Sequence, residues 1–149
     1  MNGSILIIDD DEDILKTLSA LLSDRGYATD TAKTGAEAIE KAGAKFFNLI
    51  LIDIVLPDML GTQLLKKLET TPKIRKIIIT GHATLNNAVE ALNLGADAYI
   101  MKPINPKQLL AIIDKQLTEQ EEETVMTQDK IAKFVETRAK QLAQTKRKN

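Results

Sequence analysis

Five side chains that could bind a metal ion and a phosphoryl group follow four short apolar runs of the sequence. They are Asp9 and Asp10 after the first run, Asp53 after the third, Thr80 after the fourth and Lys102 after the fifth. Clustered carboxylates repel one another and are tolerated mainly where a cation lies among them. Oxygen ligands without histidine or cysteine favour Mg²⁺ over Zn²⁺. The lysine and the threonine could then contact a phosphoryl group, one as a positive charge and the other as a hydrogen-bond donor.

Five apolar or weakly apolar runs are predicted strands that would carry these residues. The runs cover residues 5–8, 27–31, 48–52, 76–79 and 98–101. Runs of four or five aliphatic residues without polar alternation are typical of parallel strands covered on both faces. Segments of helical character separate them, so the sequence predicts a doubly wound α/β sheet of five βα units with right-handed crossovers. Ligands of such sheets bind outside the carboxyl ends of the strands, where the five side chains are expected to meet.

Each predicted helix has an apolar stripe at helical spacing. The stripes are Ile14, Leu18, Leu21 and Leu22; Ala38, Ile39 and Ala42; Leu64, Leu65 and Leu68; Leu85, Ala88, Val89 and Leu92; and Leu109, Leu110, Ile113 and Leu117. We expect the first helix to end at Arg25–Gly26 and the fourth to be closed by Gly95, because glycine favours helix C-termini. Asn105 and Pro106 are predicted to begin the fifth helix as its N-cap and first residue.

The composition excludes several classes of function. The chain has 149 residues, no cysteine, one histidine and a net charge of −1. These counts exclude disulfide scaffolds, thiol catalysis and histidine-rich metal sites, and they give no global attraction to nucleic acid or to anionic membranes. No segment has the ~18 consecutive apolar residues of a membrane span, and the N-terminus lacks the pattern of a secretory signal. We therefore expect a cytoplasmic protein with no membrane partner.

Residues 118–149 differ in composition from the rest of the chain. They contain six acidic and seven basic residues, three of the latter at 146–148, and no glycine or proline. A weak heptad seam can be drawn, but Gln128 interrupts it; its members are Val125, Ala132, Val135, Ala139 and Leu142. The composition favours a solvated helical extension or linker over a coiled coil. Nothing in this stretch is typical of a recognition helix with its own core, so we expect no direct binding of nucleic acid.

The residues at the strand ends resemble the receiver domain of two-component response regulators over about residues 4–117. The matching features are Ile7–Asp11, the segment Asp53–Gly61, Thr80 with Gly81, Tyr99, and Lys102 with Pro103. The resemblance implies a flavodoxin-like, chemotaxis-regulator-like fold with strand order 2-1-3-4-5. It also implies a receiver domain over residues 1–117, followed by a charged helical tail or linker over residues 118–149.

The resemblance further implies a role for each site residue. Asp53 would be the phosphoacceptor and Lys102 the partner of its phosphoryl group. Asp10 would be a direct Mg²⁺ ligand, Asp9 its partner through water, and the backbone carbonyl of Val55 a further ligand. An aspartate oxygen is a recognised nucleophile for phosphoryl groups, and the transfer needs mainly positioning and neutralisation of charge. The family would therefore make this chain a signalling domain, not an enzyme, apart from self-phosphorylation and self-dephosphorylation.

The expected partners and switch also follow from the resemblance. The donor would be a phosphohistidine on a histidine kinase or phosphotransfer protein; His82 is interpreted as an exposed loop residue instead. Thr80 would move toward the phosphoryl group and the Tyr99 ring would fill the vacated space. Output would pass to a downstream protein or to a domain outside this chain, and a homodimer fits the family. Val55 and His82 stand at positions that tune hydrolysis, and a valine cannot orient an attacking water, so we predict slow self-dephosphorylation.

Three other functions remain as alternatives. A haloacid-dehalogenase-type phosphatase also has an aspartate nucleophile, but it needs a second aspartate where Val55 stands. A nucleotide-binding Rossmann or P-loop protein needs a glycine-rich turn after the first strand, where Asp9 and Asp10 stand instead. The third alternative keeps the receiver fold as an interaction module that is never phosphorylated. A fragment of a transcription factor, a stand-alone regulator and a receiver from a hybrid kinase fit these residues equally.

Overall fold

The computed structural model describes residues 3–68 and 74–148, with side chains as far as residue 144. The basic cluster at 146–148 noted in the sequence therefore lies outside the described side chains. The described elements are β1 (Ser4–Ile8), α1 (Glu12–Asp24), β2 (Ala28–Ala32), α2 (Gly35–Ala44), β3 (Leu49–Ile52), α3 (Gly61–Lys67), β4 (Arg75–Thr80), α4 (Leu85–Asn93), β5 (Ala98–Met101) and α5 (Pro106–Lys148).

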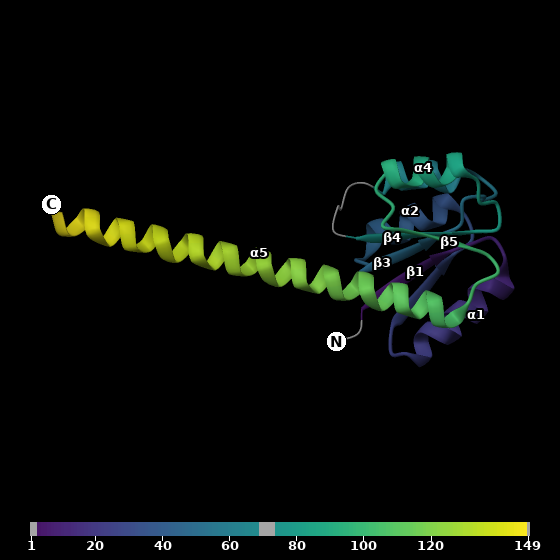
Figure 1. Ribbon diagram of the computed structural model, residues 1–149, viewed down its shortest axis with the longest axis horizontal. Helices are drawn as coiled ribbons and strands as arrows, with labels where there is room; N and C mark the ends of the chain where they lie inside the picture. Colours follow the sequence, from purple (N-terminus) through teal and green to yellow (C-terminus); the bar gives the residue numbers. More distant parts are fainter. Residues whose placement is uncertain (1–2, 69–73, 149) are drawn as a thin grey trace. The chain divides into compact units, whose positions relative to one another are not determined.

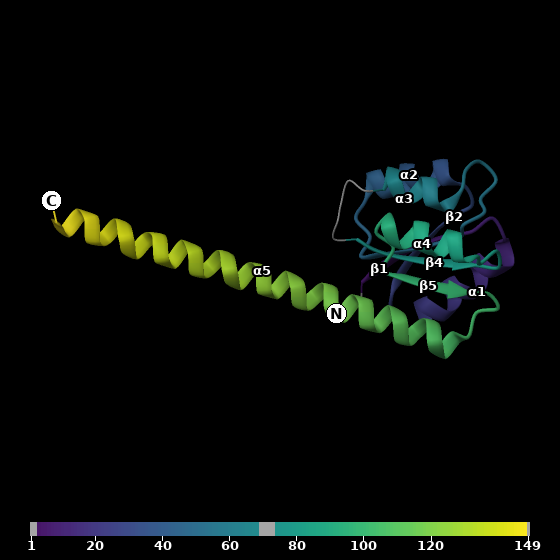
Figure 2. The same cartoon turned by 45° about the horizontal axis from the view of Figure 1, so that its top comes forward.

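The strands form one parallel sheet in the order β2-β1-β3-β4-β5. This order confirms the predicted doubly wound fold. Successive residues of a strand point to opposite faces, and β1 illustrates the result. Ile5 and Ile7 pack in the core with α1 and the start of α5, whereas Leu6 and Ile8 pack in the core with α2, α3 and α4. Figures 1 and 2 show these two helical layers on opposite faces of the sheet.

Local sequence signals set several helix ends as expected. Asp11 is the N-cap of α1, and its carboxylate accepts hydrogen bonds from the amides of Asp13 and Ile14. Gly26, just past the C-cap of α1, has φ of 92°, a left-handed conformation that favours glycine. Asn105 caps α5 by accepting from two amides of its first turn, and the helix begins at Pro106. Asp11 and Asn105 thus set where α1 and α5 begin after the carboxyl ends of β1 and β5.

Two expectations about the helices are wrong in detail. Leu15, absent from the predicted stripe of α1, is buried, whereas Ile14 and Leu21 pack only at the margin of the core. The larger difference is in α4, where the predicted apolar stripe faces outward: Leu85 is 79% and Leu92 58% exposed.

The sequence pattern indicates the wrong face of α4 because its large apolar residues are not the ones that touch the sheet. Ala91 is fully buried and Leu94, at the C-cap, packs against the core. Apolar spacing alone identifies an amphipathic helix, but it does not say whether the apolar face meets the core or solvent.

By their internal contacts the residues divide into two compact units, 1–117 and 118–149. The second unit is helical through Lys148. Up to residue 144 its apolar and charged side chains are exposed, apart from the first few residues after 117. In the described part of the chain, no helix combines the length and apolar character needed to cross a bilayer.

Candidate functional site

The three acidic residues predicted to bind a metal ion lie together at the carboxyl edge of the sheet. Asp9 follows β1 and Asp53 follows β3, and these strands are neighbours in the sheet. Oxygen atoms from Asp9, Asp10 and Asp53 all lie within 4.8 Å of one another. Asp9 and Asp53 are buried, whereas Asp10 is exposed. Three carboxylates at this spacing fit a hard divalent cation such as Mg²⁺, which binds oxygen ligands.

Lys102 completes the cluster by bridging two of these carboxylates. Its Nζ donates to Asp9 Oδ2 at 2.8 Å and to Asp53 Oδ2 at 3.1 Å. The Lys102 side chain is 20% exposed, and those of Asp9 and Asp53 are 6% and 7% exposed. Hydrogen bonds between charged groups are stronger than neutral ones, and burial strengthens them further. The lysine therefore neutralises much of the negative charge that the strand ends bring together.

The pKa values of Asp9 and Lys102 reflect burial and this ion pair. Burial raises the pKa of Asp9 above its ordinary value, the nearby Asp53 charge adds to the rise, and the hydrogen bonds from Lys102 and Asp11 oppose it. Burial acts to lower the pKa of Lys102, but its hydrogen bonds to Asp9 and Asp53 outweigh that effect and raise it. Lys102 is accordingly charged at neutral pH, whereas burial disfavours the anionic form of Asp9.

Thr80 and Tyr99 lie on neighbouring strands but are not hydrogen bonded to the acidic cluster among the described residues. Thr80 is fully buried at the end of β4, and its hydroxyl accepts from the His82 amide at 3.0 Å. Its carbonyl accepts from the Lys102 amide at 2.9 Å, which ties the ends of β4 and β5 together. His82 itself is exposed. The hydrogen-bonded network of the site thus joins Thr80 to Lys102 through the backbone.

Tyr99 is half-buried on β5 with its hydroxyl inside the protein. That oxygen forms no hydrogen bond of normal geometry with the described residues. Burial raises the pKa of Tyr99, while the nearby backbone of Thr84 acts in the opposite direction. A buried polar group without a hydrogen-bond partner costs free energy. A movement that brings the Tyr99 hydroxyl to a partner or to water would therefore be favourable. The orientation of this ring is therefore weakly held by polar contacts.

The loop after β3 contains Val55, whose carbonyl was predicted to bind the metal ion, and Asp58, whose role was not identified from the sequence. Val55 is exposed, and its amide donates to Asp53 Oδ1 at 3.4 Å. Asp58 reaches the start of α2, where its two oxygens accept from the amides of Gly35 and Ala36 at 2.8 and 2.9 Å. These bonds lower the pKa of Asp58. The carboxylate thus fastens the loop that follows Asp53 to the helix N-terminus, whose amides favour an anion.

Gly61 is the second positioning residue of this loop. A Cβ at this position would lie 2.3 Å from the Asp53 carbonyl oxygen and 2.9 Å from the Ile54 Cα. Its amide donates to the Ile54 carbonyl at 2.6 Å. The close approach of two backbone segments explains why a glycine begins α3. The loop from Asp58 to Gly61 could be recognised in the sequence. The contact between Asp58 and the start of α2 could not, because the residues that it joins lie far apart along the chain.

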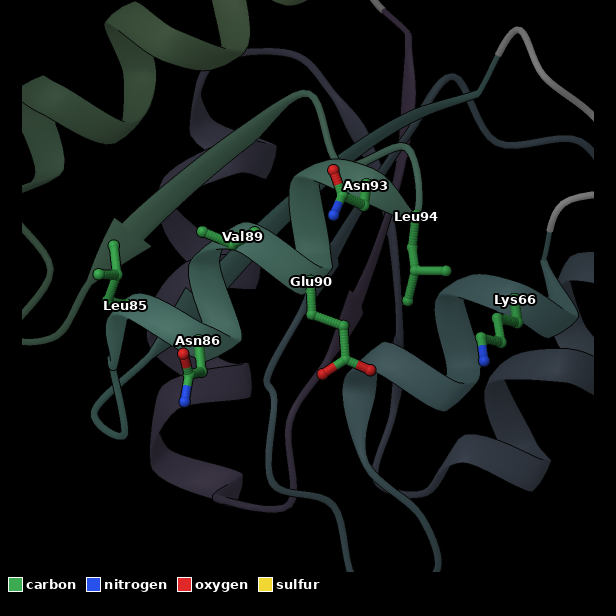
Figure 3. Close-up of a pocket in the computed structure, with 7 residues that line it drawn as sticks. All are labelled: Lys66, Leu85, Asn86, Val89, Glu90, Asn93 and Leu94. Carbon is green, nitrogen blue, oxygen red and sulfur yellow. The ribbon is translucent and has the colours of Figure 1, made fainter.

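A shallow hollow of about 490 Å³ lies away from these residues, between α3 and α4 (Figure 3). Lys66 contributes from α3, and the other lining residues belong to α4 or its C-cap: Leu85, Asn86, Val89, Glu90, Asn93 and Leu94. None of the acidic-cluster residues lines it. This hollow is therefore not the place where the reactive side chains gather.

Comparison with known proteins gives the same fold and the same family. The family model of the response regulator receiver domain matches residues 5–114 of this sequence. A response regulator receiver domain protein (CheY-like) from Methanospirillum hungatei JF-1 has 49% sequence identity and a TM-score of 0.81, with 83% of this chain and 99% of that chain covered. The beryllofluoride-activated NtrC4 receiver domain dimer has 36% identity and a TM-score of 0.75, with 78% of this chain and 98% of that chain covered.

Longer relatives contain the same domain as one part. The alginate biosynthesis transcriptional regulatory protein AlgB of Pseudomonas putida is 35% identical over 116 residues, which are 77% of this chain and 26% of that protein. The chain thus spans about a quarter of the length of this curated relative. The family match includes residues of all five strands and both acidic strand ends. From these similarities, together with the sheet order and the acidic edge, we conclude that the chain belongs to the response regulator receiver domain family.

Proposed function

We propose that Asp53 accepts a phosphoryl group from a histidine kinase or phosphotransfer protein in a Mg²⁺-dependent reaction. The observation that carries this proposal is the arrangement around its carboxylate. Lys102 Nζ lies 3.1 Å from Asp53 Oδ2, and oxygens of Asp9 and Asp10 lie within 4.8 Å of an Asp53 oxygen. A phosphoryl group brings three negatively charged oxygens, so its acceptor must be surrounded by positive charge. Membership of the receiver family supports the same assignment.

In the proposed transfer an Asp53 oxygen attacks the phosphorus of a phosphohistidine. A P–O bond forms, the P–N bond breaks, and the departing imidazole keeps the electron pair and is protonated by solvent. Lys102 offsets the charge of the phosphoryl oxygens. Asp10 is proposed as a direct Mg²⁺ ligand and Asp9 as its partner through water, with Asp53 and the Val55 carbonyl completing the protein ligands. When bound, the ion supplies further positive charge to the phosphoryl oxygens.

The proposed switch involves Thr80 and Tyr99. The Thr80 hydroxyl now accepts from the His82 amide, so its own proton is available for a phosphoryl oxygen. Movement of Thr80 would leave space for the Tyr99 ring, whose hydroxyl is buried without a well-formed hydrogen bond to the described residues. The phosphorylation state would thereby bias the surface formed by α4, β5 and α5.

The proposed place of the chain in signalling is that of a phosphoacceptor, not of a turnover enzyme. Residues 1–117 would be the receiver domain and residues 118–149 a charged helical tail or linker, a division that the two compact units support. Because relatives such as AlgB are longer transcriptional regulators, output would pass to a partner protein or to a domain outside this chain. A cytoplasmic location and a homodimer through the receiver domains stay predictions.

The test is phosphorylation of the purified chain by acetyl phosphate or phosphoramidate with Mg²⁺. A phosphate-affinity gel should show a retarded band, and mass spectrometry a gain of about 80 Da on the peptide containing Asp53. Asp53→Asn is the matched variant, since it keeps the size of the side chain and removes the nucleophile. Equal retardation of Asp53→Asn, or no adduct on the parent protein, would contradict the proposal and favour an interaction module that is not phosphorylated.

A further inference from the structure

The chain after Asp53 forms a small hairpin, residues 54–61, that ends at the first residue of α3. Val55 and Leu60 face each other in it as an antiparallel pair. Two backbone hydrogen bonds flank this pair, from amide to carbonyl: Leu56 to Met59 at 3.2 Å, and Gly61 to Ile54 at 2.6 Å. Pairs flanked in this way are the non-hydrogen-bonded pairs of antiparallel strands, whose own amides and carbonyls point away from the partner. The Val55 carbonyl therefore faces outward from the hairpin.

The outward side of Val55 is the side on which the Asp53 carboxylate lies. The Val55 amide donates to Asp53 Oδ1 at 3.4 Å. In paired strands the amide and the carbonyl of one residue point to the same side, so the Val55 carbonyl is directed toward the acidic cluster. This direction fits its proposed role as a ligand. Mg²⁺ demands near-ideal octahedral geometry, so a carbonyl that binds it must be held firmly in place.

The tip of the hairpin is held against the start of α2. One Asp58 carboxylate oxygen accepts from the Gly35 amide at 2.8 Å, and the other accepts from the Ala36 amide at 2.9 Å. Met59 covers the same helix end, since a Cβ at Gly35 would lie 2.4 Å from the Met59 sulfur. The amides of a helix N-terminus favour an anion, and hydrogen bonds to a charged group are stronger than neutral ones. The hairpin is thus fixed at its base by Gly61 and at its tip by Asp58.

We propose that Asp58 is a positioning residue for the Mg²⁺ site, a role that rests on the proposed function because it takes the Val55 carbonyl as a ligand. By holding the hairpin tip on α2, Asp58 sets that carbonyl where the ion can bind it. Asp58 is not one of the three clustered carboxylates, so it acts through the backbone that joins it to Val55. Removing a group that orients a metal ligand typically weakens metal binding about 10–100-fold.

The Asp58 carboxylate also carries a charge, and a comparison of two ions separates the effect of this charge from positioning. Loss of a negative charge alone would weaken the binding of Mg²⁺ and of Ca²⁺ alike, because both ions carry two positive charges. Loss of position would weaken Mg²⁺ binding more, because Ca²⁺ tolerates flexible ligand geometry and Mg²⁺ does not. Positioning by Asp58 therefore predicts that its removal lowers the ratio of Mg²⁺ to Ca²⁺ affinity.

Urea unfolding of the full, unphosphorylated chain at increasing Mg²⁺ or Ca²⁺ concentration tests this role. An ion that binds only the folded chain raises the free energy of unfolding with its concentration, and this dependence yields its dissociation constant separately from the stability of the ion-free protein. We expect Asp58→Ala to raise the Mg²⁺ dissociation constant about tenfold and the Ca²⁺ constant clearly less. Asp58 is exposed, so neither substitution leaves a cavity in the core. Asp58→Asn keeps one acceptor oxygen and should lie between the parent and Asp58→Ala.

Thr34→Ala is the matched control, because Thr34 caps the same helix end by accepting from the Glu37 amide at 3.1 Å. It should lower the stability and leave the Mg²⁺ dissociation constant unchanged.

Three results would overturn the role of Asp58 alone: an unchanged Mg²⁺ constant in Asp58→Ala, an equal loss for Mg²⁺ and Ca²⁺, or an equal loss of Mg²⁺ affinity in Thr34→Ala. A parent chain that does not bind Mg²⁺ would overturn this role together with the Mg²⁺ dependence of the proposed function. A chain that binds Mg²⁺ as expected but accepts no phosphoryl group would contradict the proposed function only.

Discussion

Replacing Lys102 by methionine should destabilise the protein, because the ammonium is the partner of two buried carboxylates. Methionine keeps most of the aliphatic stem, so the change removes mainly the charge. Removing one partner of a buried ion pair typically costs about 3–5 kcal/mol. The Lys102 side chain is 20% exposed, so water reduces this cost, and we expect a loss of about 2–3 kcal/mol in the free energy of unfolding. For a domain of this size the melting temperature should fall by about 6–12 °C.

Urea unfolding followed by circular dichroism would measure this loss, since the chain contains no tryptophan. Lys33→Met is the matched control, because Lys33 pairs with Glu12 on the surface, with the two side chains 50% and 61% exposed. Its loss should leave the urea midpoint nearly unchanged. Mg²⁺ should recover part of the stability of Lys102→Met, since the same carboxylates would be neutralised.

The reasoning about Lys102 is refuted if Lys102→Met and Lys33→Met unfold at the same urea concentration. A second check is the double variant with Asp53→Asn. Removing one of the two carboxylates should relieve repulsion, so the double variant should be more stable than Lys102→Met alone. Additive losses would mean that the lysine does not act through that carboxylate.

Three further changes test the loop that positions Asp53. Gly61→Ala should lower the free energy of unfolding, measured with urea, by about 1–3 kcal/mol or more, because its Cβ would lie 2.3 Å from the Asp53 carbonyl oxygen. The control, Gly43→Ala, has open space around it and should raise the free energy of unfolding by about 0.5–1 kcal/mol. A Gly61→Ala variant that is more stable than Gly43→Ala would contradict the packing described. Asp58→Ala should destabilise at neutral pH, and the difference from the parent should shrink in melts at decreasing pH, because a lowered pKa gives stability that is lost as the pH falls through it. A constant difference would exclude the ionised carboxylate as the cause. Val55→Asn should shorten the lifetime of the phosphorylated protein, measured by decay of phosphoryl label; an unchanged lifetime would contradict the prediction that Val55 slows self-dephosphorylation.

The sheet and its acidic edge could be predicted because both depend on short-range patterns. Apolar runs identify parallel strands, and the topology of a doubly wound sheet brings their carboxyl ends together. Asp9, Asp10 and Asp53 therefore lie as close as their positions at strand ends imply. The side chain of Lys102 was expected beside a phosphoryl group, and the structure places it between Asp9 and Asp53.

What could not be predicted depends on contacts between residues distant along the chain. The bonds from Asp58 to the first amides of α2 need the loop and the helix to be placed first. The outward face of α4 is a similar case. Leu85 and Leu92 have the spacing of a core stripe, and only the packed structure reveals that Ala91 is the residue against the sheet.

The sparse packing of α4 on the sheet has an energetic consequence. Of its nine residues one, Ala91, is buried, whereas α1 buries three leucines. Burying a methyl group contributes about 0.8 kcal/mol, so a displacement of α4 costs far less than one of α1. We therefore expect α4 to leave the sheet at a lower free-energy cost than α1, because fewer of its side chains are buried.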